Sequence, residues 1–208
     1  MLLFAHTGIT LGSVLGLSKV ARKTLPNPDI IESDKLARVS HVTAPALRFA
    51  SVLFDKVDYR LVLFGALLPD IIDKPLGHIL LAGSLDNGRI FAHTLLFFLI
   101  LLAMGIYRYR RFAKTGILLL ALASGGHLIL DEMWKTHETL YWPLYGWSFP
   151  EGNYENFGNW ISNMLTGLED NPHVYIPEAI GLAILIPVTL EMIRNRALIY
   201  FIRRGALR

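Results

Sequence analysis

The sequence predicts an all-α fold: an integral membrane bundle of about five transmembrane helices with one further helix at the membrane interface. Three observations lead to this prediction. Hydrophobic residues make up 53% of the 208 residues and charged residues 18%, whereas soluble domains average about 25% charged residues. The apolar residues form runs of roughly 20, the length that crosses a bilayer as a helix. The basic residues gather in the connections between these runs.

Five apolar runs are the expected membrane spans, and together they form a single domain, 1–208. They cover residues 2–20, 61–82, 90–107, 115–133 and 175–193. The first run lacks the basic n-region and cleavage site of a signal peptide and carries His6. We therefore expect it to remain in the mature protein.

The connections predict how the bundle is oriented. Most of the 20 basic residues lie in residues 19–60, 108–114 and 194–208, while residues 136–174 contain acidic residues and no Lys or Arg. Basic residues collect on the cytoplasmic side of a membrane. We therefore expect the N-terminus outside, the C-terminus and segment 21–60 in the cytoplasm, and segment 134–174 as an outer loop or cap. A prokaryotic plasma membrane is the expected location.

Residues 45–57 form the expected interfacial helix. Apolar residues recur there at near-helical spacing beside Arg48 and Lys56, a pattern typical of a helix that lies in the membrane interface. A helix that covers the cytoplasmic end of the bundle has the same pattern, so both interpretations stay open.

Ionisable side chains inside the expected spans are the main functional signal. Each costs about 2.5–3.5 kcal/mol at the centre of a membrane helix, so each needs a partner or a polar cavity. The residues at comparable depths in the outer half of the spans are His6, Asp70, Asp73, His93, His127 and Asp131. Several helices therefore bring possible ligands to one level of the membrane.

Two pairs of these residues share a helix face. Asp70 and Asp73 are three residues apart, and His127 and Asp131 are four apart, so each pair can chelate one ion. The chain has no cysteine, which excludes thiolate zinc sites and leaves His, Asp and Glu as the strong ligands. Such a ligand set suits zinc, or manganese or magnesium where carboxylates dominate.

Several motifs resemble those of the membrane-bound metal-dependent hydrolases, a family also described as LexA-binding, inner-membrane-associated hydrolases. They are AHT at residues 5–7, GALLPDIID at 65–73, GRIFAHT at 88–94, Gly126-His127 with Asp131, and WPL at 142–144. Together they extend over about residues 3–147, most of the chain. The family usually has a His before Arg89, where this chain has Gly88. The resemblance implies hydrolysis at a metal site.

A more distant similarity connects the same residues with the zinc-dependent phospholipase C and nuclease group. The ligands of that group follow an order in which this chain has His6, Asp70, His93, His127, Asp131 and His137, with Glu151 or Glu155 downstream. The similarity implies a phosphoester substrate and two or three metal ions. It also adds His137 to the expected ligands.

We interpret the protein as a membrane-embedded hydrolase that uses one to three divalent ions, with zinc as the first choice. A divalent ion activates water near neutral pH. Asp73 or Glu132 is expected to accept the proton, and Arg89 to hold the anionic group of the substrate. Asp73 is alternatively expected to serve as a further metal ligand. A lipid phosphoester is the expected substrate, because it fits a site at the depth of the headgroups.

Two other functions are compatible with the same residues. An ion- or proton-coupled transporter can use intramembrane His and Asp, but it needs a polar path through the inner halves of the spans, where ionisable groups are almost absent. A non-catalytic anchor whose basic loop binds a protein or DNA leaves the ionisable cluster unexplained. The expected partners are the lipid bilayer and the substrate, without nucleic acid, and the oligomeric state stays open.

Overall fold

A computed structural model describes residues 3–24, 49–54, 57–81, 87–151 and 157–207 of the chain. All regular secondary structure in these residues is helical, which confirms the all-α prediction. The helices are α1 (Leu3–Thr24), α4 (Tyr59–Pro75), the π-helical turn η1 (Leu76–Leu80), α5 (Leu95–Phe112), α6 (Gly116–Leu130), the 3-10 turn η2 (Met133–Lys135), α7 (His137–Leu140), α8 (Phe157–Asp170), α9 (Pro172–Arg194) and α10 (Leu198–Arg204).

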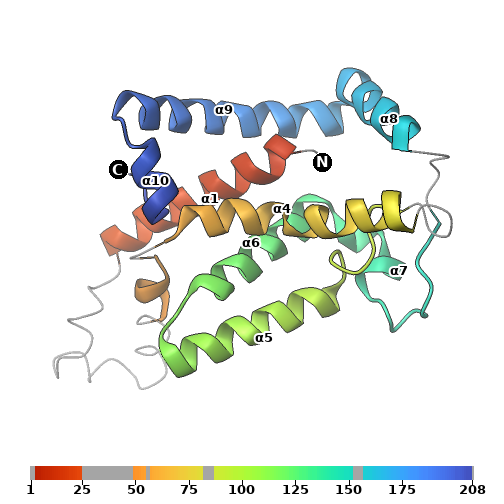
Figure 1. Cartoon of the computed structure of the whole chain (residues 1–208), viewed down its shortest axis with the longest axis horizontal. Helices are drawn as coiled ribbons and strands as arrows, with labels where there is room; N and C mark the ends of the chain where they lie inside the picture. Colours follow the sequence, from red (N-terminus) through yellow and green to blue (C-terminus); the bar gives the residue numbers. More distant parts are fainter. Residues whose placement is uncertain (1–2, 25–48, 55–56, 82–86, 152–156, 208) are drawn as a thin grey trace.

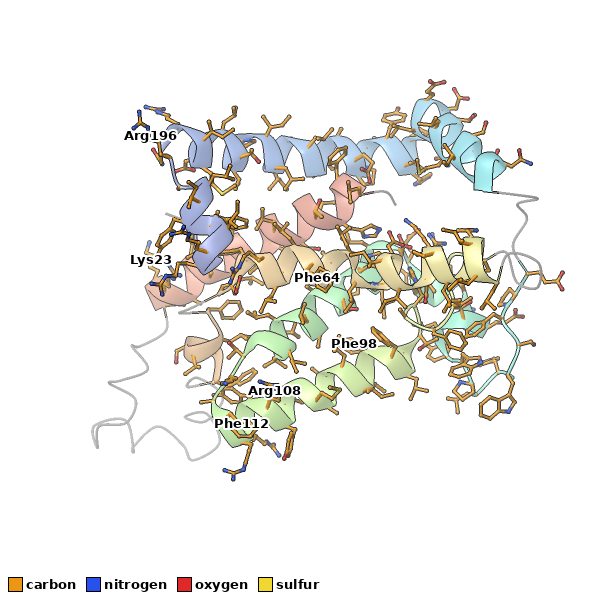
Figure 2. The ribbon with its side chains drawn as sticks, viewed as in Figure 1. Lys23, Phe64, Phe98, Arg108, Phe112 and Arg196 are labelled. Atoms are coloured by element: carbon orange, nitrogen blue, oxygen red, sulfur yellow. The ribbon has the colours of Figure 1, made fainter. Side chains whose placement is uncertain are left out.

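Helices α1, α4, α5, α6 and α9 lie side by side, and each runs opposite to the one before it in this series (Figure 1). This alternation places the basic last turns of α1, α5 and α9 at one end of the bundle. We call it the basic end. Lys23, Arg108 and Arg196 all lie there (Figure 2). The first turn of α1 and the last turns of α4 and α6 lie at the opposite end, which we call the site end.

Five of the described helices overlap the expected spans, with different ends. Helix α4 gives way to the turn η1 after Pro75, where the expected span continues to residue 82, and α5 begins and ends later than expected. Helix α5 begins at Leu95, several residues after the expected start of its span at residue 90. The Thr94 side chain accepts a hydrogen bond from the Phe97 backbone N–H (3.0 Å) and so caps the helix. The residues before Thr94 form a turn whose backbone groups bond elsewhere, and this turn carries His93.

The length and composition of the helices bear on how many cross the membrane. Among the described residues, α9 is the one helix both long and apolar enough to span a bilayer, with a mean hydropathy of 1.8. Helix α6 is apolar but has 15 residues. Helix α4 has 17 residues and includes Asp70, Asp73 and Lys74. The arrangement with five spans therefore stays a prediction.

Glycines allow the closest contacts between these helices. A Cβ atom on Gly8 of α1 would overlap the backbone of Gly181 of α9. On α4, a Cβ atom on Gly65 would lie 2.8 Å from the Leu120 carbonyl oxygen of α6. Small residues at a crossing let helix backbones approach, which favours association of helices in lipid.

A side chain of α9 also accepts hydrogen bonds from the backbone N–H groups in the first turn of α1. The carboxylate of Glu178, which is 4% exposed, accepts hydrogen bonds from the backbone N–H groups of Phe4 (2.9 Å) and Ala5 (3.2 Å). The first N–H groups of a helix have no partner inside the helix, and a negative charge there complements the helix dipole. Glu178 thereby holds the turn that carries His6.

Residues 49–54 form a helical turn that packs on the bundle. Leu53 is buried in an apolar cluster that includes Val62 and Leu118. The ring of Phe49 meets that of Tyr109 edge-on, with centroids 5.0 Å apart. These contacts support a helix that covers the end of the bundle, whereas residues 45–48 and 55–56 of the expected interfacial helix lie outside the described residues.

The crossing of α1 and α9 predicts how two glycine substitutions differ. Gly8→Ala should destabilise the protein by about 1–3 kcal/mol, because the added methyl meets backbone that cannot rotate away. Gly16→Ala is the matched control on the same helix, where a Cβ atom meets nothing within 4 Å. It should be neutral or stabilise by up to roughly 1 kcal/mol through helix propensity. Thermal unfolding in detergent measures both, and equal melting temperatures would contradict the close crossing.

Candidate metal centre

Ionisable side chains from several elements meet at the site end. His6 comes from α1, Asp70 from α4, His93 from the turn before α5, His127 from α6 and Asp131 from the C-cap of α6. All three His residues are 0% exposed, and both carboxylates are largely buried. The structure thus brings together most of the ligands expected from the sequence.

The ligand atoms face one small volume. His93 Nε2 and His127 Nε2 are 3.2 Å apart. Asp70 Oδ1 lies 3.6 Å from His93 Nε2 and 3.8 Å from His127 Nε2. Asp131 Oδ2 lies 3.9 Å from each of the same two nitrogens. Two nitrogens that bind one tetrahedral zinc ion are about 3.4 Å apart, so the spacing of the two His residues fits a shared ion.

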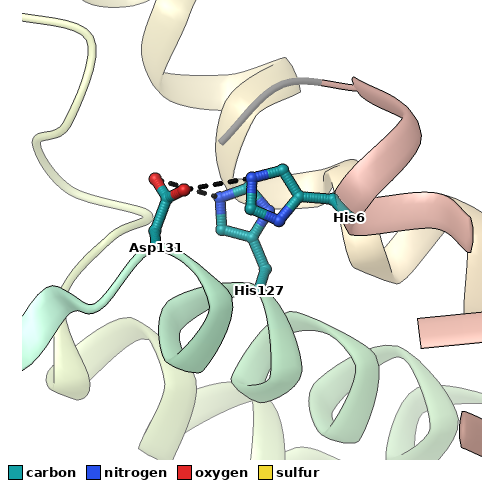
Figure 3. A group of neighbouring side chains, drawn as sticks. All are labelled: His6, His127 and Asp131. Carbon is teal, nitrogen blue, oxygen red and sulfur yellow. Dashed lines mark ion pairs between the residues drawn. The ribbon is translucent and has the colours of Figure 1, made fainter. Parts of the chain in front are cut away.

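His6 completes the cluster on the same side of Asp131 as His127 (Figure 3). Its Nε2 lies 3.1 Å from Asp131 Oδ1, and its ring stacks on that of His127 with centroids 3.9 Å apart. Neither ring nitrogen of His6 makes a hydrogen bond of good geometry within the described residues. Nδ1 has no partner there, whereas Nε2 faces Asp131. Because an unsatisfied buried polar group is costly, a role of His6 as a ligand would account for this burial. Two overlapping groups, His6–His127–Asp131 and Asp70–His93–His127, can each hold a metal ion.

The Nδ1 atoms of His127 and His93 already donate hydrogen bonds to other groups. His127 Nδ1 lies 2.7 Å from the Ala66 carbonyl oxygen, which can only accept. His93 Nδ1 lies 2.7 Å from Asp73 Oδ2. Each neutral ring therefore carries its lone pair on Nε2. In neutral rings the two lone pairs would face each other at 3.2 Å and repel. A cation bound by both nitrogens would remove this repulsion, as in metal sites whose ligands are oriented from behind.

Asp73 is the residue that orients His93. Its carboxylate accepts hydrogen bonds from the backbone N–H groups of Ile90 (2.8 Å), Ala92 (2.9 Å) and His93 (3.0 Å), in addition to the His93 ring. These donors occupy both oxygens. The structure therefore places Asp73 behind the cluster and not on the face expected for a ligand or a general base.

Two cations contact the carboxylates of the cluster. Lys74 Nζ lies 2.6 Å from Asp70 Oδ2, and Arg89 Nε and a terminal guanidinium nitrogen each lie 2.9 Å from Asp131 Oδ2. The side chains of Lys74 and Arg89 are 30% and 42% exposed. They therefore reach from the buried cluster to the surface, where an anionic group can meet them.

Three described residues that the sequence associated with the site lie outside the cluster: Glu132, His137 and Glu151. Glu132 is half exposed and pairs with Lys135 at 2.7 Å, because the chain turns at its left-handed backbone (φ 52°) immediately after Asp131. His137 is exposed at the start of α7 and stacks on Tyr141. Glu151 is exposed as well, and Glu155 lies outside the described residues.

Sequence reasoning missed the roles of two buried residues. His78 lies on η1, and a Cβ atom on Gly88 would be 2.6 Å from its Nε2. The His78 ring therefore occupies space beside Gly88, the position where the resembling family usually has a His. Glu178 is the second, through its contact with α1. Both are ionisable residues inside expected spans, which is the signal that could have identified them.

Metal content should separate the residues in the cluster from those outside it. Wild-type protein dialysed against a weak chelator should retain zinc or manganese, and His127→Ala should lose it, because His127 belongs to both groups of ligands. The matched control is His137→Ala, which should retain the metal. Elemental analysis of detergent-purified protein gives the result, and equal metal loss in both variants would contradict the site.

The position of Asp73 predicts an intermediate effect. Asp73→Asn replaces an oxygen that accepts hydrogen bonds with a donor, so it should misorient His93 and lower zinc affinity about 10–100-fold without abolishing binding. Glu132→Gln removes an exposed carboxylate and should leave the affinity within about twofold of wild type. Competition with a fluorescent chelator measures both. Unchanged affinity in Asp73→Asn would show that the carboxylate does not support the site.

Comparison with known proteins supports a membrane location. No curated protein and no solved structure matches the chain. A family described as YdjM inner membrane protein matches residues 2–202, nearly the whole sequence. This description names a location and no reaction. The chain belongs to the YdjM inner membrane protein family.

Proposed function

We propose that this protein is a membrane-embedded, metal-dependent hydrolase of phosphoesters. The observation that carries the proposal is the pair of buried His residues whose Nε2 atoms face each other at 3.2 Å beside Asp70 and Asp131. Ionisable residues inside an apolar bundle are costly, so their presence together at this place supports a function.

The roles follow from the positions of the side chains. Asp70, His93 and His127 hold one divalent ion, with zinc as the first choice, and His6 and Asp131 complete a site for one or two ions. Such an ion supplies a Lewis acid and lowers the pKa of water toward neutrality. Asp131 would act as a ligand and not as the proton acceptor, because Arg89 holds its Oδ2 and His6 Nε2 faces its Oδ1. Asp73, behind His93, and Glu132, paired with Lys135, are badly positioned for that role as well.

The cations beside the cluster support an anionic substrate. Arg89 contacts one carboxylate and Lys74 the other, and both reach the surface. A phosphoester brings the charge and the oxygen atoms that Arg binds through paired hydrogen bonds. Arg89 would hold the phosphate while the buried His and Asp residues contact the scissile end.

An aromatic loop beside the site supports a substrate from the membrane. Trp147 and Leu144 are 80% and 85% exposed. Trp142 packs against Phe91 with ring centroids 5.5 Å apart, so the loop is attached to the turn that carries His93. Exposed aromatic residues are typical of the membrane–water interface. A lipid-like phosphoester would therefore enter at headgroup depth.

The proposed topology has five spans, with the N-terminus outside and the C-terminus in the cytoplasm of a prokaryotic cell. The alternating directions of the helices bring the basic last turns of α1, α5 and α9 to one end. The tendency of basic residues to stay in the cytoplasm supports this end as the cytoplasmic one and the metal centre as the outer one. The inner halves of the expected spans contain almost no ionisable residue. This composition favours hydrolysis over ion or proton transport, which needs a polar path.

Activity on phosphoesters tests the proposal. Detergent-purified protein loaded with zinc or manganese should cleave bis-p-nitrophenyl phosphate or release the headgroup of a phospholipid, and His127→Ala should reduce this to background. Arg89→Ala should raise KM about tenfold or more, because it removes charged hydrogen bonds to the substrate. Lys135→Ala is the control, since Lys135 is an exposed cation near the same end that pairs with Glu132.

Two results would contradict the proposal in different ways. Wild-type protein that binds metal but cleaves neither substrate would overturn the reaction and leave the metal centre intact. Equal effects of Arg89→Ala and Lys135→Ala would overturn the role of Arg89 and point to general surface charge instead.

A further inference from the structure

A cavity of about 690 Å³ lies at the basic end, far along the bundle from the metal centre. Its walls come from α1, the start of α4, the end of α9 and the segment from α10 to Leu207. Lys19 and Arg22 of α1 and Arg204 of α10 contribute positive charge, and Leu15, Val188 and Met192 contribute apolar surface. The cavity therefore joins a cationic part to an apolar part.

The acidic residues of the lining leave the cavity with positive charge. Asp58 and Glu191 are part of the lining. Asp58 is bound by the forked guanidinium of Arg60, at 3.0 Å to Oδ1 and 2.7 Å to Oδ2. These hydrogen bonds lower the pKa of Asp58, so it stays ionised and paired. With Asp58 paired to Arg60, the lining has three basic residues, Lys19, Arg22 and Arg204, and one further acidic residue, Glu191.

Hydrogen bonds between elements hold the walls in place. The Ser18 hydroxyl and the Tyr59 hydroxyl are 3.0 Å apart and join α1 to α4. The Tyr59 backbone N–H donates to the Gly205 carbonyl oxygen at 2.7 Å and joins α4 to the end of α10. Arg60 also donates to the Ile202 carbonyl oxygen at 2.6 Å. The cavity is therefore formed before any ligand binds, which lowers the entropy cost of binding.

We propose that this cavity binds the phosphate group of an anionic phospholipid. Lys and Arg side chains recognise phosphate through charge and hydrogen bonds, and basic pockets between membrane helices bind anionic headgroups. Apolar side chains outside the cavity continue along α1 and α9, where Leu17, Leu190 and Ile193 are exposed. The acyl chains would lie against this surface. The proposal does not depend on the metal centre or on hydrolysis.

Paired variants with equal change of charge test the site. Lys19→Ala with Arg204→Ala removes two cations of the lining. The matched control, Lys23→Ala with Arg203→Ala, removes exposed neighbours on the same two helices that do not line the cavity. Native mass spectrometry of the full chain in detergent measures binding of phosphatidylglycerol, with phosphatidylcholine as the zwitterionic comparison.

We expect wild-type protein to prefer phosphatidylglycerol to phosphatidylcholine. The variant of the lining should bind phosphatidylglycerol at least about tenfold more weakly, and the control should stay within about twofold. Lys19→Gln alone should cause a smaller loss and serves if the double variant unfolds. Millimolar inorganic phosphate should not displace the lipid, because a free anion gains nothing from the apolar lining.

Three results would overturn the proposal. No preference for phosphatidylglycerol would exclude an anionic headgroup as the ligand. Equal loss in the two double variants would assign lipid binding to general surface charge. Displacement of the lipid by inorganic phosphate would assign the cavity to a free anion.

Discussion

The buried carboxylate of Asp73 is the contact on which the site depends. It accepts hydrogen bonds from three backbone N–H groups of residues 90–93 and from the His93 ring. These bonds hold this segment against α4. Helix α5 begins only after this turn, with Thr94 as its cap. His93 is left with Nε2 directed at His127. A fully buried charge is tolerated here because protein donors replace the water it would lose.

The alternating helix directions give the two ends of the bundle different chemistry. At the site end, carboxylates and imidazoles meet, and Lys74 and Arg89 balance the charge of Asp70 and Asp131. At the basic end, cations surround a cavity with an apolar side. The two ends therefore offer different chemistry to a ligand.

Helix α9 contributes to the site without a ligand of its own. It has the composition of a simple membrane span, yet it meets α1 at Gly181 and holds its first turn through Glu178. His6 belongs to this turn. Helix α9 therefore holds the turn that carries His6 through two backbone hydrogen bonds and one close crossing.

The sequence alone determined the all-helical class, the approximate helix positions and the central candidates His6, Asp70, His93, His127 and Asp131. Apolar runs are local, and ionisable residues inside them are conspicuous because burial is costly. The tertiary structure decided the rest. Asp73 lies behind His93, and Glu132 and His137 face away from the cluster, because hydrogen-bond partners from distant parts of the chain and the turn after Asp131 set these directions. Helical periodicity shows which residues share a face but not what that face meets.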